Sequence, residues 1–430
     1  MPYLEITKII LDIIWQFVKA WWWVPFPVFF FLLVKYFYLY NKQNEFFDKI
    51  KWSVLEVKVP QDVERPLKAM EQVISNFWTL YDPADFKEKW VEGKFLVAFT
   101  LEIAGIDGDV HFFLRIPTSM IKVFESAIYS QYPDVEITEV EDYTKKVPQD
   151  IPNKDWDMWG CNFKMLKDYC YPILTYGFFE PSMEMLEHKR VDPLAVLMEG
   201  MSRLKKGEQL WLQIRLQPTS PAEMPWVSHC QAVVNELAQR PKPSPQRSIT
   251  GEAYRTLVHG SFPFEGEEKK PESIIPPEMR LTPGERNIVE AIENKMSKSG
   301  FVANARMIYL GNREVFFKPN LKLMLNYSVG LSTTNLNGLK PSETTKIVAP
   351  AMFRDRRIYM KKRRLFRRYI HRWTPLYPQS DEGTYILNEE EIATMFHFPG
   401  KVGAPTPSFQ RIPAKKGGPP PSLPVENNTI

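Results

Sequence analysis

The sequence predicts an α+β fold in which an N-terminal transmembrane helix precedes a ferredoxin-like βαββαβ domain, a second, interrupted α+β domain and a Pro-rich C-terminal tail. Three observations predict it: an uncharged aromatic run near the N-terminus, alternating strand and helix patterns after residue 52, and a cluster of prolines near the end. The 430 residues are 44% hydrophobic and 25% charged, which is sufficient for two folded domains.

Residues 1–19 are expected to form an amphipathic helix that lies in the membrane interface. Most of these residues are apolar, and the strongly polar ones recur at spacings of three and four, so they share one stripe of a helix. These polar residues are Glu5, Lys8, Asp12, Gln16 and Lys19. No small-residue cleavage site follows, so we do not expect a secretory signal peptide.

Residues 20–41 are expected to form a single transmembrane helix. No charged side chain occurs from residue 24 to residue 34, and about 20 residues can span roughly 30 Å of hydrocarbon. More lysines follow this segment than precede it, which predicts a cell-membrane protein with most of its chain in the cytoplasm. The alternative is a buried hairpin of a soluble protein. The residues expected to anchor the helix at the headgroups are Trp21, Trp22, Trp23, Lys35 and Tyr36.

Residues 45–150 are expected to form the ferredoxin-like domain. A strand over 54–59 is followed by a helix that Pro66 opens, and a turn at 105–108 joins two alternating runs into a hairpin. A helix after Pro117 and a strand over 135–140 complete the order βαββαβ.

Residues 160–345 are expected to form the second α+β domain. Alternating residues over 210–216 predict a strand, and Thr282 with Glu285 forms a capping box that predicts the start of a helix. The proline-rich and charged stretch at 239–280 is expected to be a mobile insertion.

The motifs of common enzymes do not occur, so we expect a protein that is not an enzyme and needs no cofactor. No Walker A sequence is present, and the six histidines lack the paired spacing of a metal site. Cys161, Cys170 and Cys230 form no CxxC pair and are interpreted as inert thiols in a reducing cytoplasm. His229 and Cys230 are adjacent, but a helix separates neighbours by about 100°, so we do not expect them to share a site.

Residues 346–398 contain a strongly basic strip and then a short helix that Asn388 caps. From residue 354 to residue 372 ten Lys or Arg residues stand against one Asp, a net charge of +9 in a chain whose total is +4. The strip could bind nucleic acid, with Tyr359, Phe366 and Tyr369 stacking on bases, or anionic lipid, or it could be a solvated or protein-facing helix. The candidate contact residues are Arg354, Arg356, Arg357, Lys361, Lys362, Arg363, Arg364, Arg367, Arg368 and Arg372.

Residues 399–430 are expected to form a disordered Pro-rich linker. Eight of these 32 residues are proline, and the segment has no apolar pattern that could supply a core. Such a tail suggests that the chain ends next to another domain or a partner.

Three sequence phrases resemble an uncharacterised bacterial membrane-protein family. They are GDVHFFLRIP at 108–117, IYSQYPDVEI at 128–137 and ILNEEEIATMFHFP at 386–399. In that family a similar N-terminal region precedes a conjugation-type (type IV secretion) P-loop ATPase domain, which this sequence lacks. No catalytic residue can be assigned from the resemblance.

The resemblance and the anchor together predict a single-pass membrane-anchored accessory subunit of a DNA-translocation machine that docks or guides a separate P-loop motor. The expected partners are the lipid bilayer, that P-loop ATPase, DNA and a second copy of the chain. The alternative is a membrane-tethered structural scaffold of an envelope or secretion complex with no nucleic-acid contact.

Overall fold

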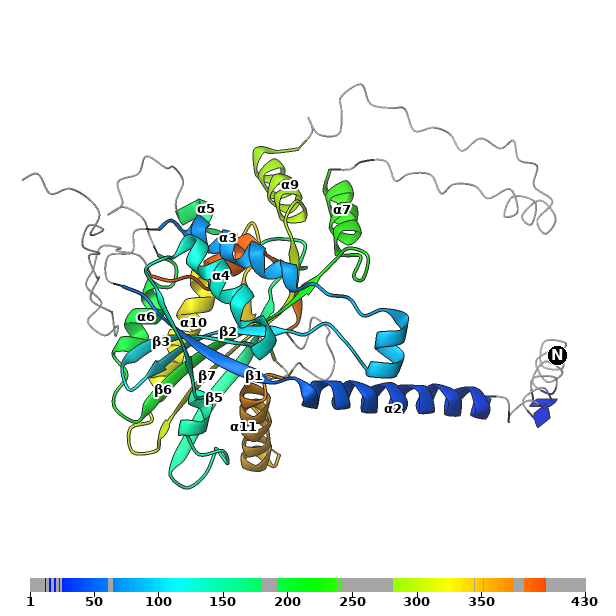
Figure 1. The fold of residues 1–430 in the computed structure, drawn as a ribbon, viewed down its shortest axis with the longest axis horizontal. Helices are drawn as coiled ribbons and strands as arrows, with labels where there is room; N and C mark the ends of the chain where they lie inside the picture. The colour runs from blue at the N-terminus through cyan, green and yellow to red at the C-terminus, as the bar shows by residue number, and fades with distance from the viewer. Residues whose placement is uncertain are drawn as a thin grey trace, which may run out of the picture. The chain divides into compact units, whose positions relative to one another are not determined.

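A computed structural model gives the fold of the chain (Figure 1). It describes residues 25–60, 65–179, 192–238, 240, 281–343, 345–350, 352–373 and 383–399, together with Asp12, Trp15, Gln16, Lys19, Ala20 and Trp23. The expected interfacial helix therefore lies mostly outside the described residues, as do the insertion at 241–280 and the tail at 400–430. The chain divides into two compact units, a smaller one of residues 1–52, 81–97 and 117–119 and a larger one of the remainder.

The larger unit contains a nine-stranded, mostly antiparallel sheet within the described residues. Its order is β4-β1-β3-β2-β6-β7-β5-β8, and β9 pairs with β7. The strands are β1 (Trp52–Lys58), β2 (Phe99–Ile106), β3 (Asp109–Pro117), β4 (Glu136–Val140), β5 (Trp156–Met165), β6 (Glu208–Thr219), β7 (Gly300–Asn312), β8 (Leu339–Pro341) and β9 (Tyr385–Asn388).

The continuity of this sheet corrects the expectation of two separate α+β domains. The expected βαββαβ order does occur, with helices α3 and α4 between the strands. However, β2 pairs along its whole length with β6, and Thr100 lies opposite Arg215. Strand β3 pairs with one edge of β2, and β6 pairs with the backbone N–H and C=O groups of the other edge. The two halves therefore share one sheet and one core.

Helices cover both faces of the sheet. One face carries a core of sheet residues with residues of α3, α4, α6, α10 and α12, whereas the opposite face is covered by α11 and the segment around Tyr143. A third apolar cluster joins α7 and α9. The helices of this unit are α3 (Leu67–Phe77), α4 (Ile121–Gln131), α5 (Tyr176–Phe179), α6 (Ala195–Ser202), α7 (Trp226–Leu237), α9 (Pro283–Met296), α10 (Leu321–Gly330), α11 (Arg354–Ile370) and α12 (Glu389–Met395).

The last helix closes the first face of the sheet. Asn388 and Glu391 form a capping box at the start of α12, as the sequence predicts. Lys298 then ties α12 to α3, since its ammonium group lies 2.6 Å from carboxylate oxygens of both Glu71 and Glu390.

The smaller unit contains α2 (Pro25–Lys49) and a π-helical turn at Glu88–Glu92. Lys35 lies over the ring of Trp90 at 5.0 Å. Gly93 has a φ of 76°, and a Cβ atom there would lie 2.2 Å from the carbonyl oxygen of Lys42, so this close approach of two backbones requires glycine.

The expected transmembrane helix over residues 20–41 is wrong. Among the described helices, none combines the length and apolar character needed to cross a bilayer. The uncharged apolar run of α2, residues 26–34, extends about 14 Å at 1.5 Å per residue, which is half of the roughly 30 Å required. Lys35 follows directly, and polar or amphipathic side chains recur from there to the end of the helix.

Candidate nucleic-acid interface

The basic strip forms α11, which lies on the sheet through an apolar stripe. Leu365, Phe366 and Tyr369 are buried, and they pack on sheet residues that include Trp211 and Ile308. Phe366 and Tyr369 are therefore core residues, which corrects the expectation that their rings stack on bases. Since the stripe occupies one side, the charged residues take the remaining circumference of the helix.

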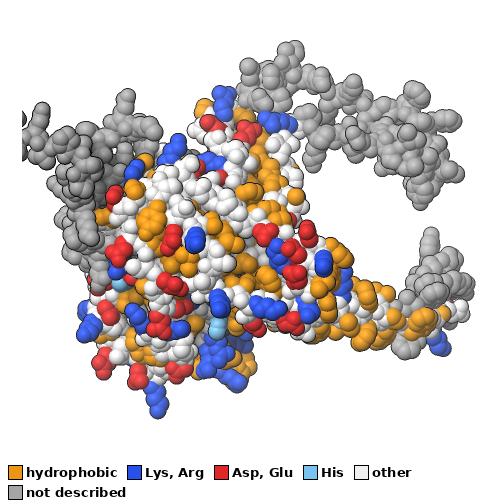
Figure 2. Space-filling view, viewed as in Figure 1, with side chains coloured by type: hydrophobic (Ala, Val, Ile, Leu, Met, Phe, Trp, Pro, Cys, Tyr) orange, Lys and Arg blue, Asp and Glu red, His pale blue; other side chains and the backbone are white. Residues whose placement is uncertain are grey.

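Five arginines on the outward side of α11 are exposed. Within the described residues, no acidic side chain forms an ion pair with any of them. Three of them, Arg356, Arg364 and Arg367, are spaced by eight and three positions and so lie within about 80° of one another around the helix, on one side of it. Figure 2 shows Lys and Arg side chains gathered where α11 lies in Figure 1. The five are Arg354, Arg356, Arg357, Arg364 and Arg367.

The lysines of the strip serve mainly to hold α11 in place. Lys361 donates to the carbonyl oxygens of Lys346 and Val348 at 3.2 and 2.9 Å. Lys362 forms an ion pair with Asp157 of β5. Arg363 donates to the hydroxyl of Tyr359 at 2.8 Å. These three residues are half-buried, whereas the five arginines above are exposed.

A pocket of about 710 Å³ lies on the flank of α11 that carries Lys362 and Arg363. Its lining combines cations with three aspartates, Asp150, Asp157 and Asp355. Because these carboxylates would repel phosphate groups, we place a polyanion on the outward arginines and not in this pocket.

Arg372 is buried, which corrects the expectation that it contacts nucleic acid or lipid at the surface. Its Nε and Nη2 atoms donate to the two carboxylate oxygens of Glu102, each at 3.0 Å, and Nη2 also lies 3.1 Å from Asp142. Glu102 further accepts hydrogen bonds from Thr100, Tyr143 and Gln213. Burial opposes ionisation of Glu102, but the Arg372 guanidinium overcomes it and holds the pKa of Glu102 below its ordinary value.

A second buried arginine caps the C-terminal end of α11. Arg306 of β7 donates to the carbonyl oxygens of Arg368 and Trp373, at 2.7 and 2.6 Å. The last carbonyl groups of a helix lack partners within the helix and carry partial negative charge, so this cation stabilises them. Burial and the nearby charge of Arg215 lower the pKa of Arg306 to about 9, which leaves it charged at neutral pH.

Two arginines of the sheet extend the basic region beyond the predicted strip. Arg115 and Arg215 both lie opposite Thr100, on β3 and β6, and desolvation lowers the pKa of each to about 10. Burial and the charges of Arg115, Arg372 and Arg367 also lower the pKa of His371. The sequence shows both arginines only as polar positions in alternating strands, which does not reveal that both lie opposite one residue of β2.

Aromatic side chains are exposed at both ends of α11. Trp373 is 50% exposed and stacks on His371 with the ring centres 4.5 Å apart. Phe353 is 66% exposed and has a φ of 53°, a left-handed conformation that bulky residues rarely adopt. Tyr359 is 40% exposed. Such rings are suited to stacking on unpaired bases.

The expected anchor residues fall in the smaller unit. Trp21 and Trp22 lie outside the described residues. Trp23 is 56% exposed and donates from its ring to the carbonyl oxygen of Ala20 at 3.1 Å. Tyr36 is 67% exposed and stacks on Tyr40. Lys35 contacts Trp90, as described above.

Comparison with known proteins adds no assignment, because no protein family and no curated protein matches this chain.

Proposed function

We propose that this protein binds DNA through the exposed arginines of α11 and acts as a non-enzymatic accessory subunit that guides DNA to a separate P-loop motor at the cell membrane. The observation that carries the proposal is the group of five exposed arginines on α11, for which the described residues provide no acidic partner. Uncompensated arginines on a rigid helix are typical of phosphate-backbone binding. The motor and the membrane location rest on the family resemblance and remain part of the proposal.

The geometry of α11 suits contact with a phosphate backbone. From Arg356 to Arg367 the helix rises about 16 Å at 1.5 Å per residue, a length over which a nucleic-acid strand presents several phosphates. The guanidinium groups stand on a helix fixed by its buried stripe and by Arg306, so binding requires no ordering of the backbone. Exposed Tyr359 and Trp373 would favour single-stranded DNA.

The test compares the binding of a single-stranded oligonucleotide at several salt concentrations. The full-length protein is compared with a variant in which Arg356, Arg357, Arg364 and Arg367 are changed to Gln. The control changes Lys205, Lys206, Lys318 and Lys322 to Gln, because these residues are also exposed and the net charge changes equally. The slope of log K against log salt is negative. We expect the α11 variant to reduce its magnitude by about 3, for four lost phosphate contacts.

The control should retain the slope of the unmodified protein. If the slope decreases equally in both variants, binding depends on net charge alone and not on α11. The absence of binding at low salt would reject the proposal.

A structural scaffold without nucleic-acid contact is the second candidate, and the surface of α2 favours it. Phe29, Phe30 and Phe31 are each more than 60% exposed, and apolar side chains cover this helix in Figure 2. Exposed apolar surface of this extent marks contact with a partner or with lipid. Changing the three phenylalanines to Ser should abolish co-flotation with lipid vesicles if α2 contacts lipid, and a scaffold of this kind should bind no single-stranded oligonucleotide with or without the change.

A further inference from the structure

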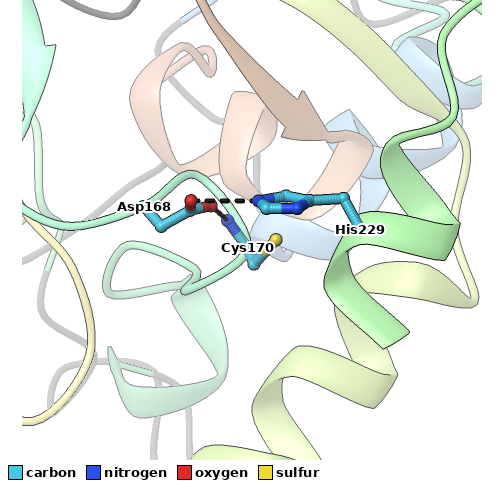
Figure 3. A group of neighbouring side chains, drawn as sticks. All are labelled: Asp168, Cys170 and His229. Atoms are coloured by element: carbon cyan, nitrogen blue, oxygen red, sulfur yellow. Dashed lines mark hydrogen bonds and ion pairs between the residues drawn. The ribbon is translucent and has the colours of Figure 1, made fainter. Parts of the chain in front are cut away.

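Asp168, Cys170 and His229 bring an oxygen, a sulfur and a nitrogen ligand atom within 4.8 Å of one another (Figure 3). Asp168 and Cys170 come from the segment that follows β5, whereas His229 comes from α7. His229 lies about 60 positions after Asp168 and Cys170, so the cluster is formed only by the folded chain. Cys230, the next residue of α7, places its sulfur 2.7 Å from that of Cys170.

Hydrogen bonds orient the ligand atoms of this cluster. Asp168 accepts a hydrogen bond at Oδ1 from the backbone N–H of Cys170, at 3.0 Å, which directs Oδ2 towards His229. The Oδ2 atom lies 3.0 Å from Nε2 of His229. A carboxylate held through one oxygen and directed through the other resembles the supported ligands of metal sites.

The burial of the cluster is asymmetric. The two sulfurs are inaccessible, whereas Asp168 and His229 are 40% and 45% exposed at their side chains. An ion could therefore reach the cluster from the carboxylate and imidazole side and remain shielded from solvent on the thiol side.

We propose that this cluster binds a zinc ion through Asp168 Oδ2, Cys170 Sγ and His229 Nε2, whose ligand atoms all lie within 4.8 Å of one another, with a solvent molecule as the fourth ligand. Zinc prefers thiolate, imidazole and carboxylate ligands in tetrahedral arrangement. The separation of 3.0 Å between the oxygen and the nitrogen is close to the edge of such a tetrahedron. Cys230 Sγ lies 2.7 Å from Cys170 Sγ but is not one of the three atoms that lie within 4.8 Å of one another, so it borders the site and is not one of its ligands.

Zinc at this position would join α7 to the segment after β5. The thiols of Cys170 and Cys230 belong to the apolar cluster that contains Val289 and Ile292 of α9. The ion would thus fix the helix pair α7 and α9 against the sheet. The Cys170 thiol releases its proton to the solvent when it binds the ion, so affinity should increase with pH.

The test uses Co²⁺ as a spectroscopic probe of the full-length protein, purified under reducing conditions. We expect one Co²⁺ per chain, a thiolate-to-cobalt charge-transfer absorption, visible bands of tetrahedral cobalt, and displacement of the cobalt by Zn²⁺. Asp168→Asn and His229→Ala change half-exposed side chains, so the fold should persist, and each should weaken Co²⁺ binding at least tenfold.

Two controls isolate the cluster. His371→Ala removes another exposed histidine, and Cys161→Ala removes a buried cysteine outside the cluster; both should bind Co²⁺ as the unmodified protein does. The absence of saturable charge-transfer absorption would overturn the proposal. So would mass spectrometry showing that Cys170 and Cys230 of freshly isolated protein are joined in a disulfide.

Discussion

Arg372 and Glu102, which are 270 positions apart in the chain, form a two-point ion pair beneath the C-terminal end of α11. Both side chains are buried, and Asp142 and Tyr143 complete the surroundings. The pair fixes Arg372, the second residue after α11, to the centre of β2, so the exposed arginines of the helix stand on a rigid support.

Arg372→Ala should destabilise the protein strongly. The variant leaves the Glu102 carboxylate buried without its cation, and breaking a buried pair in this way costs about 3–5 kcal/mol in the free energy of unfolding. Urea unfolding followed by circular dichroism measures this change. Arg364→Ala, at an exposed position of the same helix, should change the free energy by about 0.5 kcal/mol or less. Similar effects of the two variants would contradict the structure.

The same pair predicts loss of stability in acid. Burial opposes ionisation of Asp142, but hydrogen bonds and charge from Arg372 hold its pKa below the ordinary value, as for Glu102. A carboxylate with a lowered folded-state pKa stabilises the fold fully above its unfolded pKa of about 4, and this contribution is lost as the pH falls through the folded value. Urea midpoints at pH 7, 5, 4 and 3 should therefore decline below about pH 5.

Asp142→Asn isolates the contribution of one carboxylate to this pH dependence. The variant should be less stable than the unmodified protein at pH 7, and the difference between the two should narrow as the pH falls below 4. A constant difference across the range would show that the pKa of Asp142 is not lowered.

Gly160→Ala tests how closely α11 lies on the sheet. A Cβ atom at this position would lie 2.6 Å from the carbonyl oxygen of Met307 and 3.0 Å from the side chain of Leu365. We expect a loss of about 1–3 kcal/mol from this overpacking, together with weaker DNA binding as α11 shifts. A Cβ atom at Gly330 would have no atom within 4 Å, so Gly330→Ala should leave stability and DNA binding nearly unchanged.

Arg215→Gln tests whether the DNA surface extends onto the sheet. If Arg215 contacts a phosphate, the slope of log K against log salt should decrease by about 0.7 for a single strand. The variant removes a desolvated charge, so the protein should not lose stability. An unchanged slope would confine the surface to α11.

The sequence predicts local structure better than it predicts how strands pair. The capping boxes of Thr282 and Asn388 are confirmed, because the interacting residues are three positions apart. The pairing of β2 with β6 could not be predicted, since alternation shows which face a residue occupies and not which strand lies beside it. The transmembrane prediction failed because the expected span includes the aromatic residues after Lys35, whereas the uncharged run of α2 ends at Val34.

For the candidate sites as well, the sequence does not show the contacts between residues that are distant in the chain. The sequence leaves open whether Phe366 and Tyr369 stack on bases or pack on the protein, and the structure buries both. The burial of Arg372 depends on Glu102, a distant acidic residue that no local pattern connects to it. Likewise, His229 gains significance only through Asp168 and Cys170, which the fold brings to it.

The bridge that Lys298 makes between Glu71 and Glu390 has a consequence for synthesis of the protein on the ribosome. Helix α3 emerges early, but α12, which covers it, follows roughly 320 residues later, about 15–60 s at usual elongation rates. During that interval α3 can pack on the early strands and α4, but it lacks the cover that α12 provides. A nascent chain of this protein is therefore expected to be a client of ribosome-associated chaperones, and premature termination before residue 389 should yield an aggregation-prone fragment.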